Sequence, residues 1–107
     1  MPFDILALAA AGSLAAATLC QAQELRITYS NQKFEPAEIT VPAGKAFTIR
    51  VKNATAKAME FESGALKVEK VIPANSEAVI NVRAQTAGRY EFFDEFNEKS
   101  KGYVNVK

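Results

Sequence analysis

Two acidic segments hold the residues whose types and spacing could do chemistry in this chain. In the first, Ala58 to Glu62, apolar and acidic residues alternate, and another glutamate, Glu69, follows. The second, Tyr90 to Glu98, packs three phenylalanines around four carboxylates. Carboxylates that lie side by side raise each other's pKa unless a cation compensates, so a cluster of them favours a metal ion. Oxygen ligands suit hard ions such as Ca²⁺, Mn²⁺ and iron.

The same residues also have an ordinary explanation. Glu60 and Glu62 are what the solvent-facing half of a strand would contain, and Asp94 with Glu95 would form a common acidic loop. Met59 and the three phenylalanines of the second segment are more typical of a core than of a set of ligands. Composition by itself favours this interpretation, so the metal site needs further support.

Other chemistries are excluded by what the chain lacks. It has no histidine, the commonest general base and metal ligand, and its single cysteine is Cys20. Ser-His-Asp, Cys-His and zinc arrangements are therefore absent, and no Gly-rich phosphate loop occurs. A formal net charge of +1 gives no indication of a nucleic-acid partner or of direct contact with a membrane surface. A domain this small offers no long cleft for glycoside hydrolysis by a carboxylate pair.

The elements that must position these residues are strands. From Gln23 onward hydrophobic residues recur with a period of two, and Gly, Pro and Asn turns interrupt the pattern at short intervals. Many short strands separated by such turns predict an all-β Greek-key sandwich of about eight strands. The expected strands span residues 24–30, 38–41, 46–53, 58–62, 66–71, 77–84, 88–94 and 102–106.

The N-terminal residues form a separate kind of segment. Ile5 to Leu19 is an apolar run, shorter than the roughly 20 residues that a membrane span needs. Cys20 and Ala22 fit the −3 and −1 positions of a signal-peptidase site, although no Lys or Arg stands at the start. These features predict a signal peptide at 1–22 and a mature domain at 23–107, with a short membrane anchor or buried helix as the alternative. Export without a disulfide favours a bacterial periplasm.

Several motifs follow one another along the mature part of the chain. They are Phe34-Glu35-Pro36, Ile39 to Lys45, Phe47 to Asn53, Pro73-Ala74-Asn75 and Gly88-Arg89-Tyr90. In this order they resemble bacterial cupredoxin-like domains, and the resemblance covers essentially the whole of the mature part. It implies a β-sandwich of the cupredoxin type.

The resemblance also implies where a blue (type-1) copper centre would lie. Its first His ligand would fall at Met59, its Cys ligand at Asp94, its second His near Asn97 and its axial Met near Ser100. All four are replaced, and blue copper needs a thiolate. We therefore expect no type-1 site and no electron transfer through one.

A narrower resemblance concerns the first acidic segment. The run from Lys57 to Glu62, followed by Val68-Glu69 and Pro73, resembles the cupredoxin-like domain of EfeO-type periplasmic iron-uptake proteins. It is also similar to the stand-alone cupredoxin-like components of ferrous-iron transporters. The resemblance implies binding of Cu²⁺ or iron through acidic residues and a role in the oxidation or delivery of iron.

The resulting prediction is a periplasmic metal-binding protein that assists ferrous-iron uptake. We expect the two acidic segments to converge because their strands run to the same end of a cupredoxin sandwich. The expected partners are a metal ion and an inner-membrane iron permease or another periplasmic iron-uptake component, so the protein would meet the membrane only through a partner. The expected ligands of iron, copper or both are Glu60, Glu62, Glu69, Asp94 and Glu95, with Glu98 as an outer candidate and Met59 as a soft contact for copper.

Two other functions stay open. A metal-free sandwich could dock its acidic end on a basic surface of a permease or of another exported protein. A small ferroxidase that needs bound copper would be an enzyme. Convergence of the acidic side chains separates the first alternative from metal binding, and turnover of Fe²⁺ separates the second.

Overall fold

Strands fill the part of the chain that the structure describes, which is residues 23–107 of a computed structural model. The predicted signal peptide at 1–22 lies outside the described residues. No helix within residues 23–107 is long and apolar enough to cross a membrane. The strands are β1 (Gln23–Ser30), β2 (Lys33–Glu35), β3 (Glu38–Val41), β4 (Phe47–Asn53), β5 (Met59–Ser63), β6 (Val68–Ile72), β7 (Ser76–Val82), β8 (Gly88–Asp94) and β9 (Asn97–Val106).

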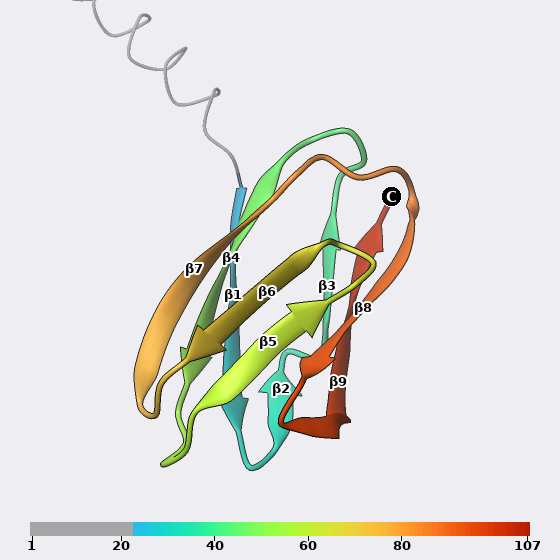
Figure 1. Cartoon of the computed structure of the whole chain (residues 1–107). Coiled ribbons are helices and arrows are strands. Elements are labelled where there is room, and N and C mark those ends of the chain that lie inside the picture. Colours follow the sequence, from blue (N-terminus) through green and yellow to red (C-terminus); the bar gives the residue numbers. More distant parts are fainter. Residues whose placement is uncertain (1–22) are drawn as a thin grey trace, which may run out of the picture.

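These strands form two sheets packed face to face (Figure 1). One sheet has the order β2-β1-β4-β7 and the other the order β3-β9-β8-β5-β6. Most neighbours are antiparallel, but β1 pairs with β4 and β3 pairs with β9 in parallel. The prediction of an all-β sandwich is confirmed, because the period-two pattern gives each sheet one apolar face that the other sheet covers.

The core between the sheets has an aromatic centre. The rings of Phe34, Phe61 and Phe92 lie with their centroids between 4.9 and 6.1 Å apart. Tyr29 of β1 lies against Phe34 at 4.8 Å. Such tilted and stacked contacts stabilise a core beyond the area that they bury. The cluster joins residues of four strands, so it ties both sheets together.

Strand β9 begins at Asn97, five residues before the predicted start. In its first half the buried residues are Ser100 and Gly102, and neither gives an apolar signal in the sequence. Gly102 is required by a close approach, since a Cβ there would collide with the ring of Phe92 and lie 2.7 Å from the carbonyl oxygen of Ala37. A strand with small inward residues is therefore invisible to a pattern of hydrophobic residues.

Strand β2 was not predicted at all. It has three residues and a single buried one, Phe34, so it shows no alternation. A two-residue turn joins it to β1, and both residues of the turn, Asn31 and Gln32, have positive φ, at 51° and 60°. Two positive φ values are what the tightest hairpin turns need. The turn geometry, rather than hydrophobic periodicity, creates this strand.

The two acidic segments meet at one end of the sandwich. Figure 1 shows the β1–β2 turn, the β4–β5 loop and the β8–β9 turn together at the lower end of the molecule. A backbone hydrogen bond runs from the N–H of Glu95 to the carbonyl oxygen of Glu60, at 2.8 Å. The start of β5 and the end of β8 are therefore fixed side by side.

Candidate functional site

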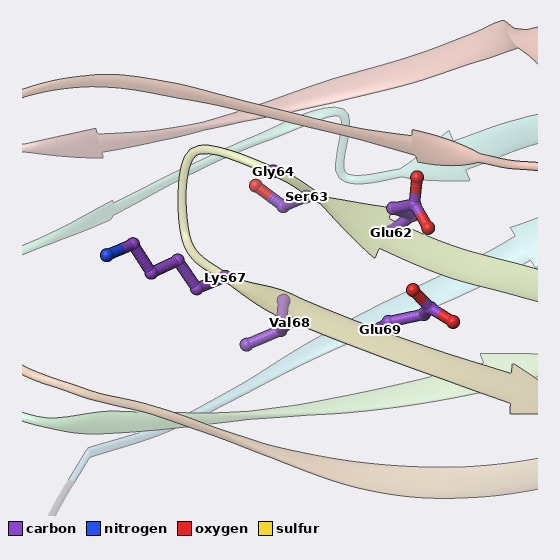
Figure 2. Close-up of a pocket in the computed structure, with 6 residues that line it drawn as sticks. All are labelled: Glu62, Ser63, Gly64, Lys67, Val68 and Glu69. Atoms are coloured by element: carbon purple, nitrogen blue, oxygen red, sulfur yellow. The ribbon is translucent and has the colours of Figure 1, made fainter.

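Three glutamates lie together on the outer face of the second sheet. Glu60 and Glu62 alternate with the buried residues of β5, and Glu62 pairs directly with Glu69 of β6. Each of the three offers one carboxylate oxygen, and these oxygens lie within 4.8 Å of one another. Oxygens that bind one ion at about 2.0–2.6 Å can lie no more than roughly 5 Å apart. The spacing therefore fits a shared cation; Figure 2 shows the Glu62 and Glu69 carboxylates projecting to the same side.

A fourth carboxylate, Glu95, adjoins this group. A hydrogen bond with Glu95 is the largest cause that raises the pKa of Glu62 to about 7, followed by burial and by the charges of Glu95 and Glu69. The pKa of Glu60 is raised as well, first by burial and then by its hydrogen bond with Glu69. Near neutral pH such a group shares protons, because its charges repel one another.

No cation relieves this repulsion within residues 23–107. The ion pairs found there join other residues: Glu24 with Arg26 and Arg50, Glu38 with Arg89, and Glu91 with Lys101. We call the four side chains the glutamate cluster, comprising Glu60, Glu62, Glu69 and Glu95.

A shallow pocket of about 330 Å³ adjoins the glutamate cluster. It extends from Glu62 and Glu69 to the turn between β5 and β6, where Gly64 and Lys67 line it. In Figure 2 the ammonium end of Lys67 points away from both carboxylates. The pocket leaves room for water or a small ligand beside the cluster. Lys67 lines the pocket, but its ammonium group does not reach the carboxylates.

Asp94 is placed differently from the glutamates. It is 3% exposed, and its carboxylate accepts three hydrogen bonds. Oδ1 accepts from the backbone N–H groups of Glu60, at 2.9 Å, and Phe96, at 3.1 Å. Oδ2 accepts from the hydroxyl of Tyr29 at 2.7 Å. Asp94 was expected to converge with the glutamates. Its carboxylate does lie next to Glu60, but it contacts the backbone N–H inside the sandwich and is not part of the three-glutamate group.

Two further candidate ligands lie away from the glutamate cluster. Met59 is 1% exposed and packs in the core, because it precedes Glu60 on β5 and so faces the opposite side. Glu98 is exposed on β9 and does not belong to the group of carboxylates within ligand distance. Alternation along a strand explains the placement of Met59. Glu98 lies on β9, beyond the β8–β9 turn that contains Glu95.

Sequence reasoning missed the partner of Asp94. Tyr29 is buried, and its hydroxyl also lies 3.2 Å from Oγ of Ser100, which donates to the carbonyl oxygen of Gln32. Burial raises the pKa of Tyr29, Ser100 lowers it in part, and the neighbouring Asp94 carboxylate raises it further. Two of the positions expected for type-1 copper ligands, Asp94 and Ser100, therefore meet at this hydroxyl. The only signal in the sequence was an aspartate at an inward-facing position of β8, which requires a buried donor.

A model of the cupredoxin-like domain matches residues 4–106 of this chain. The chain belongs to the cupredoxin-like domain family. A relative from Rickettsia prowazekii (strain Madrid E), an uncharacterized protein, is 30% identical over 84 residues, which are 78% of this chain and 67% of the relative. The family resemblance inferred from the motifs is confirmed at this level.

Solved structures of cupredoxin relatives share the fold. The metal binding domain of the Streptococcus pneumoniae D39 Cu(I) exporting P-type ATPase CopA, solved with Cu(I), aligns with a TM-score of 0.72 and 26% identity, covering 78% of this chain and 84% of that one. Reduced auracyanin from Roseiflexus castenholzii aligns with a TM-score of 0.68 and 17% identity, covering 80% and 98%. The fold is thus that of copper-binding domains.

Proposed function

We propose that this cupredoxin-like protein binds a metal ion through Glu60, Glu62 and Glu69, with Glu95 as a fourth carboxylate. The observation that carries the proposal is the group of three carboxylate oxygens within 4.8 Å of one another on an open sheet face. These charges lie together with no Lys or Arg paired to them among the described residues. A bound cation would remove the repulsion that raises the pKa of Glu62.

The donor atoms favour a hard ion over Cu(I). Every side chain of the glutamate cluster offers oxygen, the sequence has no histidine, and its one cysteine precedes the described residues. Soft thiolate and thioether ligands select Cu(I), whereas carboxylates suit iron, Mn²⁺ and similar ions. Cu²⁺ and iron are therefore the proposed ions, although a copper-binding relative was solved with Cu(I).

A type-1 copper centre is not part of this proposal. Such a centre needs a thiolate and imidazole ligands, and Asp94, at the position expected for the thiolate, has its carboxylate oxygens bonded to Glu60, Phe96 and Tyr29. We expect added Cu²⁺ to give no intense blue absorption, because no thiolate can transfer charge to it. An intense blue band in the mature protein, residues 23–107, which has no cysteine, would contradict this.

The cellular role that we propose is in ferrous-iron uptake outside the cytoplasm. It rests on the apolar N-terminal segment and on the resemblance of residues 57–73 to EfeO-type proteins and to components of ferrous-iron transporters. An inner-membrane iron permease would then be the partner that receives the ion. Co-purification of this protein with such a permease from the native membrane, and its recovery from a periplasmic extract, would test this role.

The experiment that tests metal binding is a set of thermal melts with and without Cu²⁺, Mn²⁺ and anaerobic Fe²⁺. Binding should stabilise the protein by about 2.7 kcal/mol at a hundredfold excess of ion over the dissociation constant. Glu60→Gln and Glu62→Gln should lose most of this gain. Glu77→Gln, an exposed glutamate on the other sheet, is the matched control and should keep it. If no ion raises the melting temperature of the wild type, or if the cluster variants respond as it does, metal binding at the cluster is wrong.

A second candidate function is docking of a basic partner on this face. Val71 lies opposite Glu60 in the ladder and is 52% exposed, and Phe96 follows Glu95 and is 60% exposed. A contiguous exposed apolar patch rimmed by polar residues would mark an interaction site. Val71→Ser and Phe96→Ser should leave metal binding unchanged, whereas in a docking module they would abolish capture of the partner.

A further inference from the structure

Glu60 sits where the regular pairing of β5 with β8 ends. The register pairs Phe61 with Asp94 and Glu62 with Phe93, and no further pair follows. On its other side, β8 pairs with β9, and that ladder has an irregularity between Phe93 and Asp94. In a regular antiparallel ladder, every second pair of opposite residues exchanges both backbone hydrogen bonds. Glu95 donates to the carbonyl of Glu60 at 2.8 Å, but the N–H of Glu60 donates instead to Oδ1 of Asp94 at 2.9 Å. The Asp94 side chain thus replaces a backbone carbonyl in the ladder.

The same oxygen also fixes the turn that carries Glu95. Oδ1 of Asp94 accepts from the N–H of Phe96 at 3.1 Å, so one atom joins β5 to the two-residue turn between β8 and β9. Oδ2 accepts a hydrogen bond from the buried hydroxyl of Tyr29, at 2.7 Å. The backbone of Glu95 is therefore held by β5 on one side and by the clamped turn on the other, beside the strand that carries Glu60 and Glu62.

We propose that Asp94 is a positioning residue that holds Glu95 against Glu60 and so adds the fourth carboxylate to the glutamate cluster. The effect of Asp94 on metal affinity rests on the proposed function. The placement of Glu95 by Asp94 rests on the hydrogen bonds alone. Asp94 itself stays in the interior and touches no ion. Its contribution to affinity is exerted through Glu95, as is typical of groups that orient the ligands of a metal.

Asp94→Asn is the conservative variant because the network can be rewired around it. The amide oxygen can still accept from Glu60 and Phe96. The amide nitrogen can donate to the hydroxyl oxygen of Tyr29, which then donates to Ser100, whose own hydroxyl already donates to Gln32. Asp94→Ala removes the acceptor altogether. Tyr29→Phe removes the bond to Oδ2 and the contact with Ser100 but leaves Oδ1 with both of its donors.

The experiment measures Mn²⁺ affinity of the purified protein, at a temperature where each variant is folded. Asp94→Ala should weaken binding at least tenfold, as should Glu95→Gln, and the double variant should be no weaker than Glu95→Gln alone. Asp94→Asn and Tyr29→Phe should stay within about twofold of the wild type. A loss in Asp94→Asn as large as that in Glu60→Gln would make Asp94 a ligand and overturn the proposal, whether or not Asp94→Ala folds.

Backbone amide exchange tests the same inference without metal. The N–H of Glu95 and of Glu60 should be protected in the wild type, in Asp94→Asn and in Tyr29→Phe, and should exchange at least tenfold faster in Asp94→Ala. Equal protection in Asp94→Ala would overturn the positioning role. If the wild type binds none of Mn²⁺, Cu²⁺ and anaerobic Fe²⁺ while the exchange result is as expected, the proposed metal function fails and the placement of Glu95 by Asp94 stands.

Discussion

Asp94 and Glu62 lie on adjacent strands of one sheet but on opposite faces of it, and their carboxylates have opposite surroundings. Asp94 is buried and accepts hydrogen bonds from two backbone N–H groups and a tyrosine hydroxyl. Glu62 is half-buried on the outer face, where Glu69 pairs with it in the ladder and its pKa is raised by its hydrogen bond with Glu95, by burial and by the charges of Glu95 and Glu69. The buried carboxylate of Asp94 receives donors, whereas those of the glutamate cluster have no paired Lys or Arg among residues 23–107. This difference separates a structural acid from candidate ligands.

Among the substitutions that test this difference, Asp94→Ala should lower the free energy of unfolding the most. The substitution leaves the part-buried N–H groups of Glu60 and Phe96 without their acceptor and removes the bond from Tyr29 to a carboxylate. An unsatisfied group costs about 1–3 kcal/mol. We expect the free energy of unfolding to fall by about 3 kcal/mol or more, measured by urea denaturation at pH 7. Glu60→Ala at the outer face is the comparison and should cost much less; equal losses would remove the distinction.

Tyr29→Phe should have a smaller effect on stability. It keeps the ring in the aromatic core and deletes only the bond to Oδ2 of Asp94 and the contact with Ser100. Hydrogen bonds to charged groups are worth roughly 1.5–3 kcal/mol, so we expect a loss of about 1.5 kcal/mol. The same denaturation experiment measures it. A loss as large as that of Asp94→Ala would mean that the two backbone N–H groups contribute little.

Glu62→Gln should raise the free energy of unfolding of the metal-free protein, whereas the two preceding substitutions lower it. The pKa of Glu62 rises from an ordinary 4.5 to about 7 on folding, so the folded protein binds the proton more tightly. The free energy of unfolding therefore falls as the pH rises between these values. Removing the charge should make the protein more stable at pH 8 and flatten the dependence between pH 5 and 7. Melts across this range check it, and an unchanged profile would contradict the repulsion in the cluster.

Glu38→Gln should change the free energy of unfolding least. It contrasts a glutamate that has a positive partner, Glu38, with one that lies among other carboxylates, Glu62. A hydrogen bond from Asn105 and then the charge of Arg89 hold the pKa of Glu38 below its usual value. Its stabilisation is present above the pKa of the unfolded chain and is lost as the pH falls through the folded value. The variant should thus be slightly less stable than the wild type at pH 7. A gain in stability, as expected for Glu62→Gln, would contradict the pairing.

Most of the sandwich follows from the period of two in the sequence. The alternation in β5 also predicts that Glu60 and Glu62 share an outer face, and Glu69 joins them because β6 is the next antiparallel strand. The pattern does not reveal β2 or the first half of β9, where a positive-φ turn and small inward residues replace it. Periodicity reports only burial of apolar side chains, so elements built otherwise escape it.

The role of Asp94 could be predicted only in part. Its parity with Phe92 on β8 puts it on the inner face, which rules out a position beside Glu62. The sequence cannot name its donors, because they come from β1, β5 and the following turn and are brought together by the tertiary fold. Long-range hydrogen bonds of this kind leave no local pattern.

The tight fit at Gly102 makes the alignment of β8 with β9 unambiguous. A slip of one residue would place Lys101 or Tyr103 against the ring of Phe92, and a slip of two would place Ser100 or Val104 there, each with a Cβ for which no space exists. A hairpin with a polar first half could otherwise slide between alternative pairings. The absence of a Cβ at Gly102 thus fixes the register of β8 with β9, and this register determines which residues form the turn after Asp94.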